Sequence, residues 1–191
     1  MTKPGATFGR SDVARLLGIE DWQLGILASR RYAYRIRPSA RRARGRGKKG
    51  LYSVQDVYKI ALALQMQALG LEARVIGEIL RILSAKWSHA FVQRPKEVNN
   101  HRYLEINYSR APWASRERLL KDWGPESVED WVKVCTTDQL VWLTVNALMR
   151  QAIFVMPFDA ILDEVDERIL GRKIGPTPAL PGFSDKEPVE K

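Results

Sequence analysis

The sequence predicts an α+β protein, in which a mostly helical N-terminal region carries a basic β-hairpin and a smaller α+β region follows. Three observations support this prediction. Apolar residues recur at helical spacing through residues 8–83, a cationic stretch with period-2 aromatic spacing interrupts them, and helix and strand patterns alternate over residues 84–172. Residues 173–191, rich in proline and charge, are typical of a disordered tail.

Composition is typical of a globular protein, and the positive charge is concentrated in one region. The 191 residues are 45% hydrophobic and 28% charged, with a net charge of +9. Residues 1–60 hold 14 Lys and Arg against 4 Asp and Glu, a net of +10. Residues 61–191 hold 17 against 18, a net of −1. This distribution indicates a polyanionic partner, and it favours nucleic acid over an anionic membrane.

The first 29 residues predict two short helices joined by a tight turn. Ser11 is the expected N-cap of the first helix, and Gly18 is expected to end it. Glu20 or Asp21 is expected to start the second helix, which runs to about Ser29. Two short helices around a glycine-containing turn form the helix-turn-helix pattern.

The stretch Arg30–Lys49 is the most unusual part of the chain, because ten of its twenty residues are Arg or Lys and none is acidic. Tyr32, Tyr34 and Ile36 occupy alternate positions, which predicts a strand with one buried face. Glycines follow, and Leu51–Tyr52 predicts a short return strand. Such a hairpin would present guanidinium groups to phosphates. A disordered basic loop or a targeting-like run is the alternative that this stretch alone leaves open.

Two longer helices are expected after the basic stretch. Ser53 and Asp56 approximate a capping box, which opens a helix that continues to about Leu69 and stops at Gly70. The next helix carries an apolar stripe at helical spacing. The residues of this stripe are Val75, Ile76, Ile79, Leu80 and Leu83.

This order of elements resembles the MerR-type DNA-binding domain, a winged helix-turn-helix. The segments that carry the resemblance are VARLLGI (Val13–Ile19), LYSVQDVYKIALALQMQALGL (Leu51–Leu71) and VIGEIL (Val75–Leu80). In that family a Tyr-Ser-x-x-Asp step opens the third helix and a Leu-Gly-hydrophobic step joins the third helix to the fourth. Both steps occur here, as Tyr52–Asp56 and Leu69–Leu71. The resemblance covers about residues 8–83 and implies a regulator that binds duplex DNA.

The second helix departs from the family pattern. Members usually carry a Thr-Leu-Arg-Tyr-Tyr-Glu-like segment there, whose Arg and Tyr reach DNA, whereas Gln23–Ala28 is Gln-Leu-Gly-Ile-Leu-Ala. Those contacts cannot be carried over, so we expect base contacts from the second helix and its far end, and phosphate contacts from the hairpin. The predicted DNA-binding residues are Trp22, Gln23, Arg30, Arg31, Arg35, Arg37, Arg41, Arg42, Arg44, Arg46, Lys48 and Lys49.

Residues 84–172 predict a second, α+β domain for dimerisation or effector binding. Strands are expected at 103–108 and 153–158, and helices at 116–121 and 128–134. A strand is expected at 140–146, although residues 140–151 also fit a buried helix. Asp159 is expected to cap a last amphipathic helix that ends at Gly171. The solvated face of this helix is expected to hold Asp163, Glu164, Asp166 and Glu167.

No catalytic or metal-binding constellation is visible. Cys135 is the single cysteine and is expected to be a buried or half-buried thiol, while His89 and His101 lack ligand spacing. We therefore expect no enzymatic activity, metal or cofactor. Five of the six tryptophans lie from Trp87 onward, where core or dimer-interface packing is favoured and an aromatic ligand cage is the alternative.

The sequence as a whole predicts a bacterial-type, MerR-like transcriptional regulator on double-stranded DNA. We expect a cytoplasmic, nucleoid-associated homodimer without a membrane segment, and the sequence indicates no small-molecule effector without excluding one. Dimerisation is expected through the Trp-rich stretch 87–142 and through an apolar stripe of the last helix. This stripe contains Ile161, Leu162, Val165 and Ile169. An architectural or recombination-accessory DNA-binding protein of phage type is the alternative, and a catalytic C-terminal domain is a third hypothesis.

Overall fold

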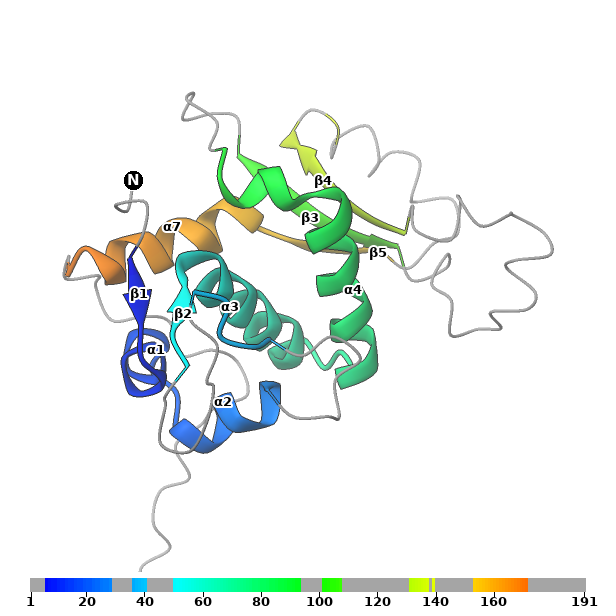
Figure 1. Ribbon diagram of the computed structural model, residues 1–191. Coiled ribbons are helices and arrows are strands. Elements are labelled where there is room, and N and C mark those ends of the chain that lie inside the picture. Colours follow the sequence, from blue (N-terminus) through cyan, green and yellow to red (C-terminus); the bar gives the residue numbers. More distant parts are fainter. Residues whose placement is uncertain are drawn as a thin grey trace, which may run out of the picture. The chain divides into compact units, whose positions relative to one another are not determined.

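The computed structural model describes residues 6–28, 36–40, 50–93, 101–107, 131–137, 139 and 153–171. Within these ranges the protein contains five α-helices, one short 3-10 helix and two small antiparallel sheets (Figure 1), so the predicted α+β class is confirmed. Contacts divide the chain into two compact units. The N-terminal unit contains the described residues up to Leu80 and those from Asp163 onward, and the central unit contains those from Arg81 to Leu162.

Helix α1 (Arg10–Leu17) opens the N-terminal unit. Its N-cap is Gly9, whose N–H donates to Oδ2 of Asp12 at 3.1 Å, so the predicted cap at Ser11 is wrong. The Asp12 carboxylate supplies the acceptor one turn ahead, which lets the helix begin before Ser11. Gly18 ends α1 as predicted, with a φ of 65° that a glycine adopts without steric strain.

Helix α2 (Asp21–Leu27) follows after a short turn, with Glu20 as its N-cap. The side chain of Gln23 accepts a hydrogen bond from the Glu20 N–H at 2.8 Å. Leu24 and Leu27 are each 1% exposed and fix the inner face of the helix. The predicted pair of short helices is therefore present, with the second helix ending before the expected Ser29.

Strand β1 (Thr7–Phe8) pairs antiparallel with β2 (Tyr52–Ser53), which leads directly into helix α3 (Val54–Ala68). Tyr52 is therefore in a strand as predicted, but its partner in that strand pair is Phe8 of β1. Ile36, the described residue of the predicted first hairpin strand, lies in no strand. Residues 32–35 of the predicted hairpin and its tip at 41–49 lie outside the described residues. Gly70, with a φ of 83°, follows the end of α3, as predicted.

Helices α3 and α4 (Ala73–Lys86) both carry many buried apolar residues. The predicted stripe of α4 is confirmed, because each of its five residues is at most 6% exposed. On α3, polar Asp56 and Tyr58 are also buried, at 5% and 4% exposure. Both make the hydrogen bonds described below, which offset the cost of removing polar atoms from water.

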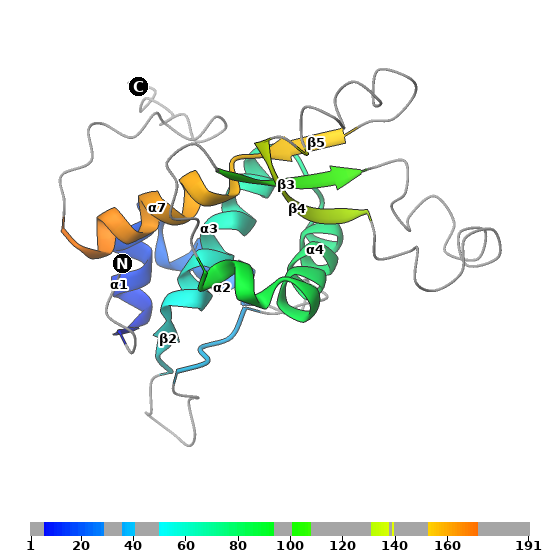
Figure 2. The same ribbon diagram turned by 90° about the horizontal axis from the view of Figure 1, so that it is seen from above.

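The central unit contains a three-stranded antiparallel sheet in the order β4–β3–β5, seen from above in Figure 2. The strands are β3 (Arg102–Asn107), β4 (Val132–Thr136) and β5 (Ile153–Met156), and the 3-10 helix η1 (Ser88–Phe91) precedes them. The predicted strands near 103 and 153 are confirmed. The helix predicted at 128–134 is wrong from Val132 onward, because β-branched valines there pair with β3 in a ladder. The helix expected at 116–121 and the segment 140–151 lie outside the described residues.

Helix α7 (Phe158–Ile169) begins two residues earlier than a cap at Asp159 would place it. Asp159 is not its cap, since its carboxylate is 2% exposed and binds Arg102. The expected stripe is also not an open dimer surface, because Ile161, Leu162 and Val165 are at most 8% exposed within the single chain. The helix is followed by Gly171 with a φ of 68°, at the predicted end.

Candidate nucleic-acid interface

Asp56, at the start of α3, is hydrogen-bonded to Ser39 and Ser53, which lie on either side of the cationic segment 41–49. Oδ2 of Asp56 accepts from the backbone N–H of Ser39 and of Ser53, each at 2.9 Å, and from the Ser39 hydroxyl at 2.6 Å. Oγ of Ser53 accepts the Asp56 N–H at 3.2 Å and lies 2.9 Å from Oγ of Ser39. The predicted capping box is therefore confirmed, and it has a second role that the spacing did not predict.

This second role is to hold together the two chain positions that flank the cationic residues. Ile36 and Tyr52, on either side of that segment, are 3% and 4% exposed and anchor it in the core. Burial raises the pKa of the Tyr52 hydroxyl, and the nearby Arg10 partly offsets this effect. Between Ser39 and Ser53 the sequence places six cationic residues, which lie outside the described ranges: Arg41, Arg42, Arg44, Arg46, Lys48 and Lys49.

Helix α2 exposes an apolar pair. Trp22 is 62% exposed and Ile26 is 37% exposed, and residues four apart lie on the same side of a helix. Gln23 is half-buried, and its Oε1 accepts the helix-capping bond from Glu20. A bidentate contact to adenine would need this oxygen as well as the amide NH₂, so capping competes with the predicted base contact.

Arg10 is a charged residue of this surface that the sequence analysis did not single out. Its Nε lies 3.1 Å from Oδ2 of Asp21, and its NH2 nitrogen donates to the Asp21 carbonyl. A Cβ placed on Gly25 would lie 3.0 Å from that same nitrogen, so the glycine leaves room for the guanidinium against α2. In the sequence, the signal for this close approach is Gly25, a glycine inside an otherwise helical pattern.

The predicted DNA-binding residues are only partly described by the structure. Trp22, Gln23 and Arg37 are described, and Arg37 is exposed. The structure places the first two on adjacent positions of α2. The remaining predicted residues lie outside the described ranges, namely Arg30, Arg31, Arg35, Arg41, Arg42, Arg44, Arg46, Lys48 and Lys49.

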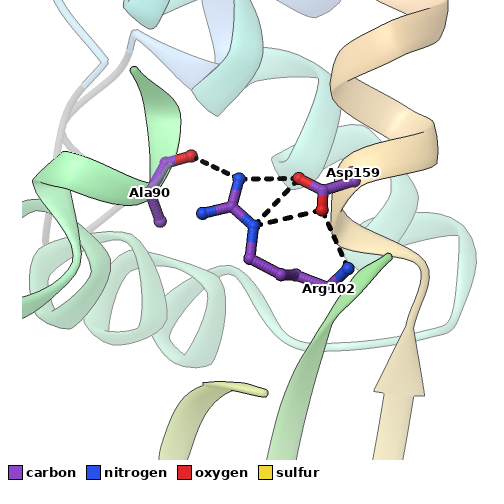
Figure 3. Close-up of polar contacts among 3 residues, drawn as sticks. All are labelled: Ala90, Arg102 and Asp159. Carbon is purple, nitrogen blue, oxygen red and sulfur yellow. Dashed lines mark hydrogen bonds and ion pairs between the residues drawn. The ribbon is translucent and has the colours of Figure 1, made fainter. Parts of the chain in front are cut away.

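In the central unit, Arg102 connects β3, α7 and η1 (Figure 3). Its NH2 nitrogen lies 2.7 Å from Oδ1 of Asp159 and 2.9 Å from the carbonyl oxygen of Ala90. Its Nε and backbone N–H also donate to Asp159, at 3.1 and 2.8 Å, and its guanidinium carbon lies 5.6 Å from the ring centre of Phe158. These bonds engage both carboxylate oxygens of Asp159. Because they join β3, α7 and η1, we assign the cluster a structural role.

Cys135 lies on β4 and is 5% exposed, which confirms the expected buried thiol. Burial, with a further contribution from the Glu105 carboxylate, raises the pKa of the thiol to about 11. The thiol donates weakly to the carbonyl of Tyr103, with sulfur and oxygen 3.7 Å apart. A thiol with this pKa carries little thiolate at neutral pH, and thiolate is the nucleophilic form.

The described part of the chain holds no group of three or more His, Cys, Asp or Glu residues arranged to bind a metal ion. None of its helices combines the length and the hydropathy needed to cross a membrane. The chain matches no protein-family model, and neither the curated proteins nor the solved structures include a significant match. The resemblance to the MerR-type domain therefore stays a hypothesis carried by the residues quoted above.

Proposed function

We propose that the protein binds double-stranded DNA as a MerR-like transcriptional regulator, with a winged helix-turn-helix in its N-terminal unit. The observation that carries the proposal is the Asp56 cluster, which joins Ser39 to Ser53 by hydrogen bonds at the start of α3. A segment with six cationic residues between two fixed ends is suited to contact phosphates as a wing.

Helix α2 is the proposed major-groove element, as the second helix of a helix-turn-helix. Its exposed side chains, Trp22 and Ile26, favour apolar contacts with the C5-methyl groups of thymine. Gln23 contributes to base recognition only if it gives up its bond to the Glu20 N–H. Arg30, Arg31 and the exposed Arg37 would add phosphate or minor-groove contacts beside the helix.

A homodimer on a palindromic site is part of this proposal. A single small DNA-binding module buries limited surface, and a second copy increases both affinity and site length. The dimer surface would come from residues other than the buried stripe of α7. The exposed Val155 of β5, at 41%, is one apolar residue that remains accessible in the described part of the single chain.

The test combines selection of bound sequences from a random DNA pool with the salt dependence of binding. We expect a palindromic consensus. We also expect the logarithm of the binding constant to fall with the logarithm of salt concentration with a slope of about −4.5, the value for roughly five neutralised phosphates. The double variant Arg42→Ala/Arg44→Ala should weaken binding to all sequences about equally. Arg74→Ala is the control for the loss of one exposed positive charge outside the wing. A slope shallower than about −2 would refute the basic wing as a phosphate clamp.

A second candidate function is an architectural or recombination-accessory DNA-binding protein. The observation in its favour is the engagement of the Gln23 side-chain oxygen in helix capping, which leaves α2 with a mainly apolar exposed face. Such a face discriminates fewer bases than hydrogen-bonding side chains do. Random-pool selection that yields steep salt dependence without a consensus would favour this candidate over the regulator.

A further inference from the structure

The C-terminal half of α7 is hydrogen-bonded to α1 and α3. The hydroxyl of Tyr58 on α3 donates to Oδ1 of Asp166, across 108 residues of sequence. The NH1 nitrogen of Arg168 donates to the carbonyl of Leu16 on α1 at 2.9 Å, across 152 residues. All these residues belong to the N-terminal unit, and Figure 2 shows the end of α7 beside α1.

The carbonyl that Arg168 binds lies at the turn between α1 and α2. The last four carbonyls of a helix lack partners within the helix, and Leu16 is the second-last residue of α1. The amides of Gly18 and Ile19 bond to the carbonyls of Arg15 and Ala14. Arg168 therefore supplies a partner for the Leu16 carbonyl from outside the helix, and its positive charge is favourable at a helix C-terminus.

The guanidinium of Arg168 is itself held in place. Its NH2 nitrogen forms an ion pair with Glu164, one turn earlier on α7, and the Arg168 side chain is only 21% exposed. A Cβ at Gly18 would lie 3.9 Å from its NH1 nitrogen, so the group contacts the turn directly. A planar guanidinium can bind the carboxylate and the carbonyl at the same time in a fixed geometry.

We propose that Arg168 is a positioning residue for DNA recognition, which fixes the turn between α1 and α2 and thereby the orientation of α2. The part of this inference that concerns DNA rests on the proposed function. The part that concerns the turn does not, because it follows from the bonds of Arg168 to Leu16 and Glu164. Helix α7, near the end of the chain, would thus be part of the proposed DNA-recognition unit formed by α1 and α2.

The first experiment measures the turn without DNA, by amide hydrogen exchange on the full-length protein. In Arg168→Ala the amides of Gly18 and Ile19 should exchange at least about tenfold faster, since loss of a charge-assisted bond exceeds one tenfold step in local stability. The interior of α3 should keep its protection. Arg74→Ala, which removes an exposed positive charge on α4, is the control for net charge. Equal exchange of these two amides in both variants would overturn the inference.

The second experiment measures DNA binding by the same variants. Arg168→Ala should lower the ratio of specific to non-specific affinity by about tenfold, which corresponds to the loss of one charge-assisted hydrogen bond. The dependence of the binding constant on salt concentration should not change. Arg168→Lys, which can still reach one acceptor, should recover part of this ratio. A reduced salt slope with an unchanged ratio would overturn the positioning role, because it would make Arg168 a phosphate contact.

Two further outcomes have fixed meanings. If the wild-type protein does not bind DNA, the proposed function fails, and hydrogen exchange alone decides the role of Arg168 in the turn. If Arg168→Ala does not fold, Glu164→Gln replaces it, since this variant keeps Arg168 and removes its ion-pair partner. Faster exchange at Gly18 and Ile19 in Glu164→Gln supports the inference, and unchanged exchange overturns it.

Discussion

Replacing Asp159 by Asn tests whether the Arg102 cluster holds the central unit together. The Asp159 side chain is 2% exposed and that of Arg102 is 15% exposed, so the pair is nearly removed from water. In Asp159→Asn the guanidinium keeps the Ala90 carbonyl and loses its counter-charge. Breaking a buried ion pair from one side costs about 3–5 kcal/mol, because it leaves an uncompensated charge.

The assay is thermal unfolding followed by circular dichroism. For a chain of this size, 1 kcal/mol shifts the Tm by roughly 2–4 °C, so the expected decrease is roughly 6–20 °C. Glu167→Gln is the matched control, since it removes an exposed carboxylate from the same helix. We expect its Tm to change by less than about 2 °C, as exposed charges contribute little.

A Tm for Asp159→Asn equal to that of the control would refute this reasoning. The double variant Arg102→Met/Asp159→Leu adds a second criterion, because apolar residues of similar volume remove both charges together. It should be clearly more stable than Asp159→Asn, since replacing a whole buried ion pair is often close to neutral. A double variant no more stable than the single one would show that the destabilisation does not arise from the unpaired charge.

Three other predictions concern separate parts of the molecule. Asp56→Ala should lower the free energy of unfolding of the N-terminal unit by about 3 kcal/mol, because three hydrogen bonds of roughly 1 kcal/mol each are lost. Urea unfolding measures this change, and a decrease under about 0.5 kcal/mol would contradict the prediction. Cys135 should react slowly with a thiol reagent at pH 8 in the folded protein, and folding stability should fall as pH rises from about 9 towards 11. The sign follows because the unfolded thiol loses its proton near 9 and the folded thiol only near 11, so rapid labelling would disprove the buried environment. Trp22→Ala should leave the Tm unchanged but abolish the affinity difference between a selected thymine site and its uracil counterpart, whereas an equal difference in both proteins would rule out a methyl contact by Trp22.

The features predicted correctly from the sequence are those set by local chemistry. The Ser53 and Asp56 capping box, the end of α1 at Gly18 and the apolar stripe of α4 each depend on residues within one or two helical turns. The first helix cap was misplaced by two residues because Gly9 and Ser11 are both acceptable caps. The carboxylate of Asp12, which binds the Gly9 N–H, decided between them.

The features that could not be predicted depend on partners distant in the chain. The helix predicted at 128–134 fails at Val132 and Val134, which pair with β3 as a strand. Asp159 has the typical position of a helix cap, yet the guanidinium of Arg102, 57 residues away, binds its carboxylate. The expected solvated face of α7 failed at Asp166 for the same reason, because Tyr58 donates to it. The periodicity of a segment does not indicate which side chain, distant in the sequence, will bind to it in the folded protein.

The last helix also changes how the N-terminal unit can be studied. The sequence predicts a continuous DNA-binding domain at 8–83, whereas contacts add the described residues from Asp163 onward to the same unit. A fragment that stops at residue 84 would leave the buried Tyr58 hydroxyl without its Asp166 acceptor and the Leu16 carbonyl without Arg168. It would also lack Val165, which is 3% exposed. Weak DNA binding by this fragment could therefore arise from a loosened α1–α2 turn as well as from loss of a dimer. Dimerisation is better tested in the full-length chain, where the α7 contacts are kept.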